Sequence, residues 1–319
     1  MDPELWAAAD RIFPVRVPRG WFEAINPQDP SDPLALQALP DPRELLADPE
    51  DLDDPVGEQG LSPAPWVIQK HADRALLLLT KRCHMYCRYC FRRTLEVSGR
   101  EDPTDAELDA AIAWCSRAGL RELILSGGDP LAVRDDRLFE VIDRLRPAVP
   151  VLRLHTRAPI TAPQRVTEAL VAGLSMRRPL WVLVHANHPR ELRPEVRDAL
   201  GRIVDAGVPV LNQSVLLRGV NDDVEVLTRL SEELVALRVF PYYLHHTDRV
   251  RGNAHLRVDA ARGLALHAEL ARRVSGLALP RYVYDPPEGS GKLSVREAIR
   301  KGLLPAEPAS GHSGDHDGS

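Results

Sequence analysis

Three cysteines share one short stretch, Cys83-His84-Met85-Tyr86-Cys87-Arg88-Tyr89-Cys90, which follows an apolar run at residues 75–80. The run predicts a buried strand, and the loop after it can direct three thiolates to one point. Three thiolates on one loop suit a [4Fe–4S] cluster whose fourth iron accepts a non-protein ligand. Zinc sites with four thiolates usually consist of two separated CxxC pairs, and only Cys115 remains elsewhere. A structural metal site and three buried thiols remain the alternatives.

The composition of the 319-residue chain limits the classes of function. A hydrophobic content of 44% is enough for a large core, in one domain or two. The net charge of −5 gives no general attraction to nucleic acid. Apolar stretches are too short to cross a membrane, and residues 1–14 lack the basic start of a secretory signal. Because four cysteines so placed do not form a disulfide framework, we expect a cytoplasmic protein.

Both ends of the chain differ from its middle. Residues 1–66 contain repeated Asp-Pro turns, and we expect short helices near Glu4–Ile12 and Pro42–Leu46. Trp21, Phe22 and Trp66 indicate that this N-terminal extension packs on the main domain at residues 67–304. Residues 305–319 are rich in Gly, Ser, His and Asp, which predicts a disordered tail.

The middle of the chain alternates strands and helices. Thr104-Asp-Ala-Glu107 is a capping box that begins the first helix, whose apolar face includes Cys115 as a core residue. Such alternation predicts a parallel sheet with helices outside it. The expected strands are 75–80, 123–126, 151–155, 180–185, 208–215, 239–244 and 279–284; the expected later helices include 163–172, 194–206, 224–237 and 260–274.

Nearly every expected strand has polar residues at its C-terminal end, where α/β barrels carry their active sites. We therefore predict an α/β fold, a partial (β/α)6-type barrel with six main strands and a flanking seventh. The strand-end groups are the cysteine loop, Gly127-Gly128-Asp129-Pro130, His155-Thr156-Arg157, His185-Ala186-Asn187, Asn212-Gln213-Ser214, His245, His246 and Asp248, and the segment from Asp285 to Lys292.

Several segments together resemble the lysine 2,3-aminomutase family of radical S-adenosylmethionine (SAM) enzymes. The resemblance covers roughly residues 25–304, and its most specific segments are 70–74, 83–92, 126–131, 211–222, 241–248 and 285–292. It implies a radical SAM barrel and an isomerase that uses a [4Fe–4S] cluster, SAM and pyridoxal 5′-phosphate (PLP). The reaction implied is the transfer of the amino group of L-lysine from Cα to Cβ, which gives β-lysine.

The resemblance also implies a set of cofactor residues. Cys83, Cys87 and Cys90 would bind the cluster, and Lys292 would bind PLP covalently. Lys70 and Arg74 would supply cations for the PLP phosphate. From spacing alone, Lys292 and Arg74 are better explained as surface charges, and a pair of glycines is more often only a tight turn. The remaining cofactor contacts expected are Tyr89, Gly127, Gly128, Asp129, His155 and Gln213.

The same resemblance predicts the substrate. Arg92 would bind the carboxylate, a bidentate task for which arginine is well shaped. Asp248 and Asp285 would bind the ε-ammonium group, and two acids in one pocket would repel glutamate. Alternatives are an aminomutase acting on arginine or on a peptide lysine, and a non-catalytic metal-binding protein. An electron donor such as flavodoxin or ferredoxin is expected, without nucleic acid or membrane partners; homo-oligomerisation is left open.

The chain departs from the longer members of this family. No cysteine follows Cys115, so the C-terminal zinc-binding cysteines of the lysine-fermentation enzymes are missing. Gly-Gly-Asp-Pro and Tyr-Tyr-Leu-His resemble the short bacterial branch, which makes β-lysine for elongation factor P. Asp285, in contrast, fits the fermentation branch. The metabolic role and the stereochemistry at Cβ therefore stay open.

Overall fold

The fold is built on one nine-stranded sheet whose strands follow one another in chain order. The computed structural model describes residues 3–93, 100–288 and 291–306. Strands β2 to β8 are parallel, and antiparallel pairs with β1 and β9 finish the two edges. The strands are β1 (Val67–His71), β2 (Arg74–Leu78), β3 (Glu122–Ser126), β4 (Val151–His155), β5 (Leu180–Val184), β6 (Val210–Val215), β7 (Phe240–His245), β8 (Arg281–Tyr284) and β9 (Leu293–Ser294).

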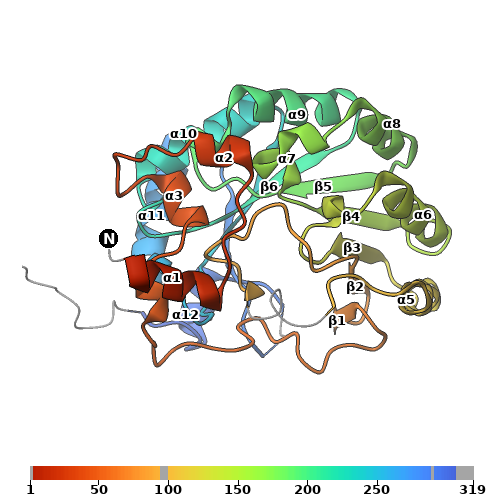
Figure 1. Cartoon of the computed structure of the whole chain (residues 1–319), viewed down its shortest axis with the longest axis horizontal. Helices are drawn as coiled ribbons and strands as arrows, with labels where there is room; N and C mark the ends of the chain where they lie inside the picture. Colours follow the sequence, from red (N-terminus) through yellow and green to blue (C-terminus); the bar gives the residue numbers. More distant parts are fainter. Residues whose placement is uncertain (1–2, 94–99, 289–290, 307–319) are drawn as a thin grey trace, which may run out of the picture.

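Helices follow most of the parallel strands and cover the outside of the sheet. Figure 1 shows α5, α6 and α8 on the side of the molecule opposite the red N-terminal helices. The α-helices are α1 (Pro3–Ile12), α2 (Arg19–Glu23), α3 (Pro33–Ala38), α5 (Asp105–Arg117), α6 (Asp135–Leu145), α7 (Ala158–Thr161), α8 (Glu168–Met176), α9 (Pro194–Asp205), α10 (Val224–Ala236), α11 (Ala260–Arg273) and α12 (Val295–Arg300). Short 3₁₀ turns are η1 (Pro42–Leu45), η2 (Pro130–Ala132), η3 (Pro163–Arg165), η4 (Pro189–Glu191) and η5 (Ala254–Leu256).

The predicted α/β fold and incomplete barrel are confirmed, since in the described part of the chain β1 and β9 do not pair with each other. The capping box of α5 is also present, with the Glu107 amide donating to the Thr104 hydroxyl at 3.2 Å. Cys115 lies in the core, where burial raises the pKa of its thiol to about 12.

Two expectations are wrong. The helix expected at 163–172 begins later, because η3 comes first and Thr167 then caps α8 by accepting the Leu170 amide at 3.1 Å. Phe22 is 60% exposed, whereas Trp21 is buried and donates to the Leu34 carbonyl. The edge strands β1 and β9 were not predicted. Of the predicted tail, residues 307–319 lie outside the described residues.

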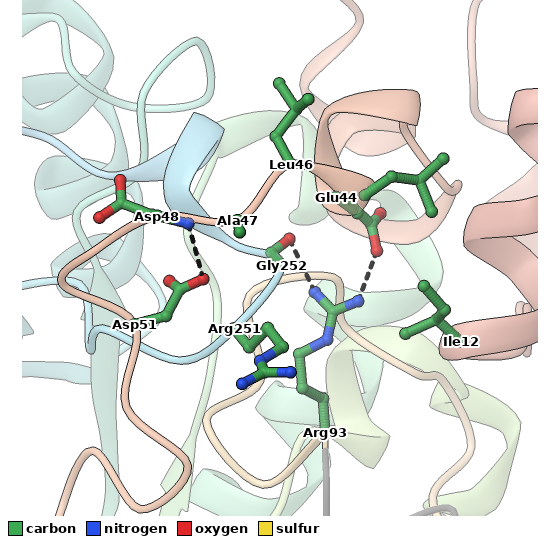
Figure 2. Close-up of a pocket in the computed structure, with 10 residues that line it drawn as sticks. Ile12, Glu44, Leu46, Ala47, Asp48, Asp51, Arg93, Arg251 and Gly252 are labelled. Carbon is green, nitrogen blue, oxygen red and sulfur yellow. Dashed lines mark hydrogen bonds and ion pairs between the residues drawn. The ribbon is translucent and has the colours of Figure 1, made fainter.

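Buried ion pairs join the N-terminal extension to the cysteine loop. Arg88 donates through Nε and Nη2 to the Glu44 carboxylate at 2.8 and 2.5 Å, and both side chains are fully buried. Arg93 donates to the same carboxylate at 2.5 Å and to the Gly252 carbonyl at 2.9 Å. Figure 2 shows the two contacts of Arg93, with Glu44 and with Gly252, beside a cavity of about 390 Å³. The extension thus supports the loop that carries the three cysteines.

Candidate active site

A second cavity, of about 560 Å³, lies inside the incomplete barrel. Its walls come from the ends of the parallel strands, the cysteine loop and residues 56 and 58 of the N-terminal extension. Every residue that the sequence predicted for the site lines this one cavity: Lys70, Arg74, Cys83, Cys87, Tyr89, Cys90, Arg92, Gly127, Gly128, Asp129, His155, Gln213, Asp248, Asp285 and Lys292. Their roles stay predictions, but the barrel brings all of them together.

A buried arginine contacts the cysteine loop. Arg157, directly after β4, donates from Nη1 to the Cys87 sulfur at 2.8 Å. Burial lowers the pKa of Arg157, but its interactions with Cys87, Tyr89 and Glu191 outweigh burial and hold the pKa above its usual value. A fixed guanidinium here suits a sulfur that carries negative charge, as an iron ligand does. Three predicted cluster cysteines around one cavity therefore fit a [4Fe–4S] cluster.

The arrangement fits a single metal ion less well. Within residues 3–93, 100–288 and 291–306, no three His, Cys, Asp or Glu side chains converge on a point that one ion could occupy. A zinc site needs such convergence, whereas a cluster spreads its thiolates over several irons.

The two glycines after β3 are required by the close approach of their loop to the chain before Cys83. A Cβ atom on Gly127 would lie 2.1 Å from the Thr80 carbonyl oxygen, and one on Gly128 would lie 2.3 Å from that of Lys81. Gly127 also has a φ of +133°, which side chains disfavour. The Gly128 amide donates to the Thr80 carbonyl at 2.7 Å. These contacts set the distance between the loop after β3 and the cysteine loop after β2.

Asp129 lines the cavity, but its carboxylate is already engaged by the protein. It accepts from the Thr156 hydroxyl at 2.6 Å and from the amides of Arg157 and Leu131 at 2.8 and 2.9 Å. Burial raises the pKa of Asp129 despite these contacts. The visible task of this side chain is to hold the loops after β3 and β4 together.

Neutral histidines line the middle of the cavity. The side-chain amide nitrogen of Gln213 lies 3.2 Å from Nδ1 of His155 and 3.1 Å from Nε2 of His185. Burial lowers the pKa of His155 well below its usual value, and lowers those of His185 and His245 to about 3. Nε2 of His155 is buried and has no hydrogen-bond partner among the described residues. A polar ligand in the cavity would satisfy it.

Lysines and acids line the end of the cavity formed by β1 and the β8–β9 segment. Lys292 donates from Nζ to Asp285 Oδ2 at 2.8 Å, and Lys70 Nζ lies 3.6 Å from Asp285 Oδ1. Burial raises the pKa of Asp285, but the two lysines outweigh it and lower the pKa overall. Burial, and then Asp285, raise the pKa of Asp248 to about 7. Residues 289 and 290 of the predicted PLP loop lie outside the described residues.

Arg92 and Arg74, the two arginines predicted for the site, pair with different carboxylates. Arg92 donates from Nε and Nη2 to the Glu58 carboxylate at 3.0 and 2.6 Å. Arg74 begins β2, at the opposite end of that strand from the cysteines, and donates to Asp73 at 3.1 Å. Sequence reasoning placed Arg157 among the polar residues at the strand ends without giving it a role, and it missed Glu58. Glu58 follows no strand end, so it carries no such signal.

Comparisons with known proteins agree on the kind of enzyme. Residues 77–230 match the family model described as the Radical SAM superfamily. The L-lysine 2,3-aminomutase of Acetoanaerobium sticklandii is 40% identical over 278 residues, which are 86% of this chain and 67% of that protein. The L-lysine 2,3-aminomutase of Buchnera aphidicola is 36% identical over 290 residues, 89% of this chain and 85% of that protein.

Two further matches bear on substrate and fold. A glutamate 2,3-aminomutase of Clostridioides difficile is 35% identical over 275 residues, 85% of this chain and 65% of that protein. The solved structure of Streptococcus suis SuiB bound to S-adenosylmethionine has a TM-score of 0.50 at 13% identity, covering 67% of this chain and 50% of SuiB. It supports the fold alone. No helix in the described residues is long and apolar enough to span a membrane.

Proposed function

Since the chain belongs to the lysine 2,3-aminomutase family of radical SAM enzymes, we propose that it converts L-lysine to β-lysine. It is a radical SAM aminomutase, an isomerase acting on a small amino acid, and the cofactors of its family are a [4Fe–4S] cluster, SAM and PLP. We infer in addition that it works in the cytoplasm with a flavodoxin or ferredoxin as electron donor.

One observation supports lysine in particular. Asp285 already binds the ammonium group of a lysine side chain, because Lys292 Nζ lies 2.8 Å from its Oδ2. Where Lys292 would instead hold PLP, the Asp285 carboxylate would accept the ε-ammonium of a substrate in its place. Asp248 lines the same cavity. A glutamate side chain would instead place a third carboxylate against these two.

We assign each part of the cavity to a cofactor according to the residues that line it. Cys83, Cys87 and Cys90 would hold the cluster, and the loop after β3 with Gln213 would hold SAM. Lys292, Lys70 and Arg74 would hold PLP. Together these groups supply radical chemistry at Cβ and a carrier for the migrating amino group. The chain's own tasks are to bind the substrate's two charged ends, to keep its histidines neutral and to exclude water.

Anaerobic reconstitution tests the proposal. The enzyme with iron, sulfide, SAM, PLP and dithionite should form β-lysine from L-lysine, and should act on arginine and glutamate at least tenfold more slowly, on the order of one charge-assisted contact. Borohydride reduction and peptide mapping should place the pyridoxyl group on Lys292. Turnover of glutamate but not lysine would show a glutamate enzyme, and one bound zinc without SAM cleavage would show a metal-binding module.

A further inference from the structure

A turn of the N-terminal extension closes the substrate end of the cavity, outside residues 77–230 that match the family model. Asp54 shapes this turn, accepting the amides of Glu58 and Gln59 at 2.9 and 2.7 Å. Val56 accepts a hydrogen bond from Lys70 through its carbonyl. Gly57 has a φ of +63°, and a Cβ atom there would lie 1.9 Å from the Pro287 carbonyl oxygen. The 54–58 turn therefore has a defined position against the cavity.

Glu58 uses that position to hold Arg92. Both oxygens of the Glu58 carboxylate accept from the guanidinium, at 3.0 and 2.6 Å, and each side chain is only 9% exposed. Arg92 Nη1 also donates to the Gly127 carbonyl at 3.2 Å, and its guanidinium lies 4.8 Å from the centre of the Phe91 ring. A carboxylate, a carbonyl and an aromatic face together fix both the plane and the direction of the guanidinium.

We propose that Glu58 is a positioning residue for the substrate: it holds the Arg92 guanidinium in the orientation that meets the amino acid's carboxylate. This inference rests on the proposed function of the cavity. An arginine side chain has many rotamers, and a bidentate partner removes that freedom before the substrate arrives, so less entropy is lost on binding. The nearly buried pair also keeps Arg92 from being an isolated buried charge in the empty cavity.

The test uses two ligands that differ in the carboxylate. 6-Aminohexanoate is lysine without its α-amino group, so it presents the carboxylate and the distal ammonium but lacks the amine through which an α-amino acid bonds to PLP. Pentylamine presents the ammonium alone. Calorimetric titration of the PLP-loaded enzyme measures the affinity for each. In Glu58→Gln the affinity for 6-aminohexanoate should fall about tenfold, the loss of one charge-assisted contact, while pentylamine should bind as in the wild type.

A matched control comes from the surface. Asp143 accepts hydrogen bonds from Arg177 Nε and Nη2 at 2.8 and 2.6 Å, the same side-on geometry far from the cavity, and Asp143→Asn should change neither affinity.

With L-lysine, Glu58→Gln should raise KM about tenfold and leave kcat within about twofold. Unchanged or tighter 6-aminohexanoate binding would overturn the proposal, tighter binding meaning that Glu58 competes with the substrate. Equal loss of both ligands would also overturn it. Wild-type enzyme inactive on lysine would instead count against the proposed function.

Discussion

Asp285 and Asp248 both line the cavity with Lys70 and Lys292, but their pKa values shift in opposite directions. Asp285 is held ionised by Lys292 and Lys70, whereas burial and the charge of Asp285 raise the pKa of Asp248 to about 7. Pairs of carboxyl groups whose pKa values are pushed apart are typical of functional sites. The difference makes the affinity for a cationic substrate depend on pH near neutrality.

Asp248 should therefore set an acid limb in the pH profile. Below about pH 7 its carboxyl is protonated and no longer attracts the ε-ammonium, so kcat/KM for lysine should fall by up to about tenfold per pH unit. In Asp248→Asn the limb should vanish and the plateau should drop about 10- to 100-fold. Steady-state kinetics between pH 5.5 and 9, with iron content as a control, check this. An acid limb that persists in the variant would assign it to another group.

Replacing a cysteine of the loop should remove the cluster, whereas replacing the cysteine of α5 should not. Cys87→Ala should remove the iron–sulfur absorbance and SAM cleavage, because a predicted iron ligand is lost beside Arg157. Cys115→Ala should leave both intact, since that thiol is buried in the helix core. Iron and sulfide analysis after anaerobic reconstitution measures the difference. Loss of the cluster in Cys115→Ala would contradict the three-cysteine assignment.

At the scale of elements, the loops after β2 and β3 act as one unit. The Gly128 amide bonds to Thr80 and the Asp129 amide to Arg82, at 2.7 and 2.8 Å. Glycine pairs are often only turns, but here the absence of a side chain lets two backbones approach closely. The predicted cluster loop and SAM loop are therefore coupled through main-chain contacts.

Gly128→Ala should damage this unit. Its Cβ would lie 2.3 and 2.4 Å from the carbonyl oxygens of Lys81 and Arg82, so the cost should be about 1–3 kcal/mol, with weaker SAM binding and lower iron content. Gly201→Ala on α9 is the matched control, because no atom lies within 4 Å of the added Cβ. It should be neutral or stabilising by about 0.5–1 kcal/mol. Denaturant unfolding compares the two; similar losses in both would refute the argument.

At the scale of the whole molecule, the extension and the barrel depend on one buried acid. Glu44 pairs with both Arg88 and Arg93, and its side chain is fully buried. Glu44→Ala would leave two buried guanidinium groups without this carboxylate, which should cost about 3–5 kcal/mol. Thermal unfolding should show this loss, together with reduced cluster retention. A shift no larger than that of an exposed pair such as Arg19–Glu23 would mean that water replaces the carboxylate.

The sequence predicted the barrel because its signals are local. Strands β2 to β8 are apolar runs, and the polar residues at their ends are adjacent in sequence, so periodicity located most of the cavity wall. Glu58 was missed because it lies among Asp-Pro turns, which indicate only loop structure, and its partner is 34 residues away. β1 and β9 were missed since edge strands of five and two residues lack a clear period. An ion pair between residues far apart in the sequence, such as Glu58 and Arg92, leaves no periodic pattern in the sequence.

Lys70 lies on β1, and Asp285 directly follows β8, so their contact at 3.6 Å joins the first and last parts of the sheet. In the described part of the chain no backbone hydrogen bonds pair β1 with β9, so this ion pair connects the two edges of the sheet through side chains. Both side chains are mostly buried, with 8% and 18% of their surface exposed, so salt screens this pair much less than it would screen an exposed one. A charged group that binds Lys70 or Asp285 in this cavity would therefore act on the contact between the two edges of the sheet without the loss of a backbone hydrogen bond.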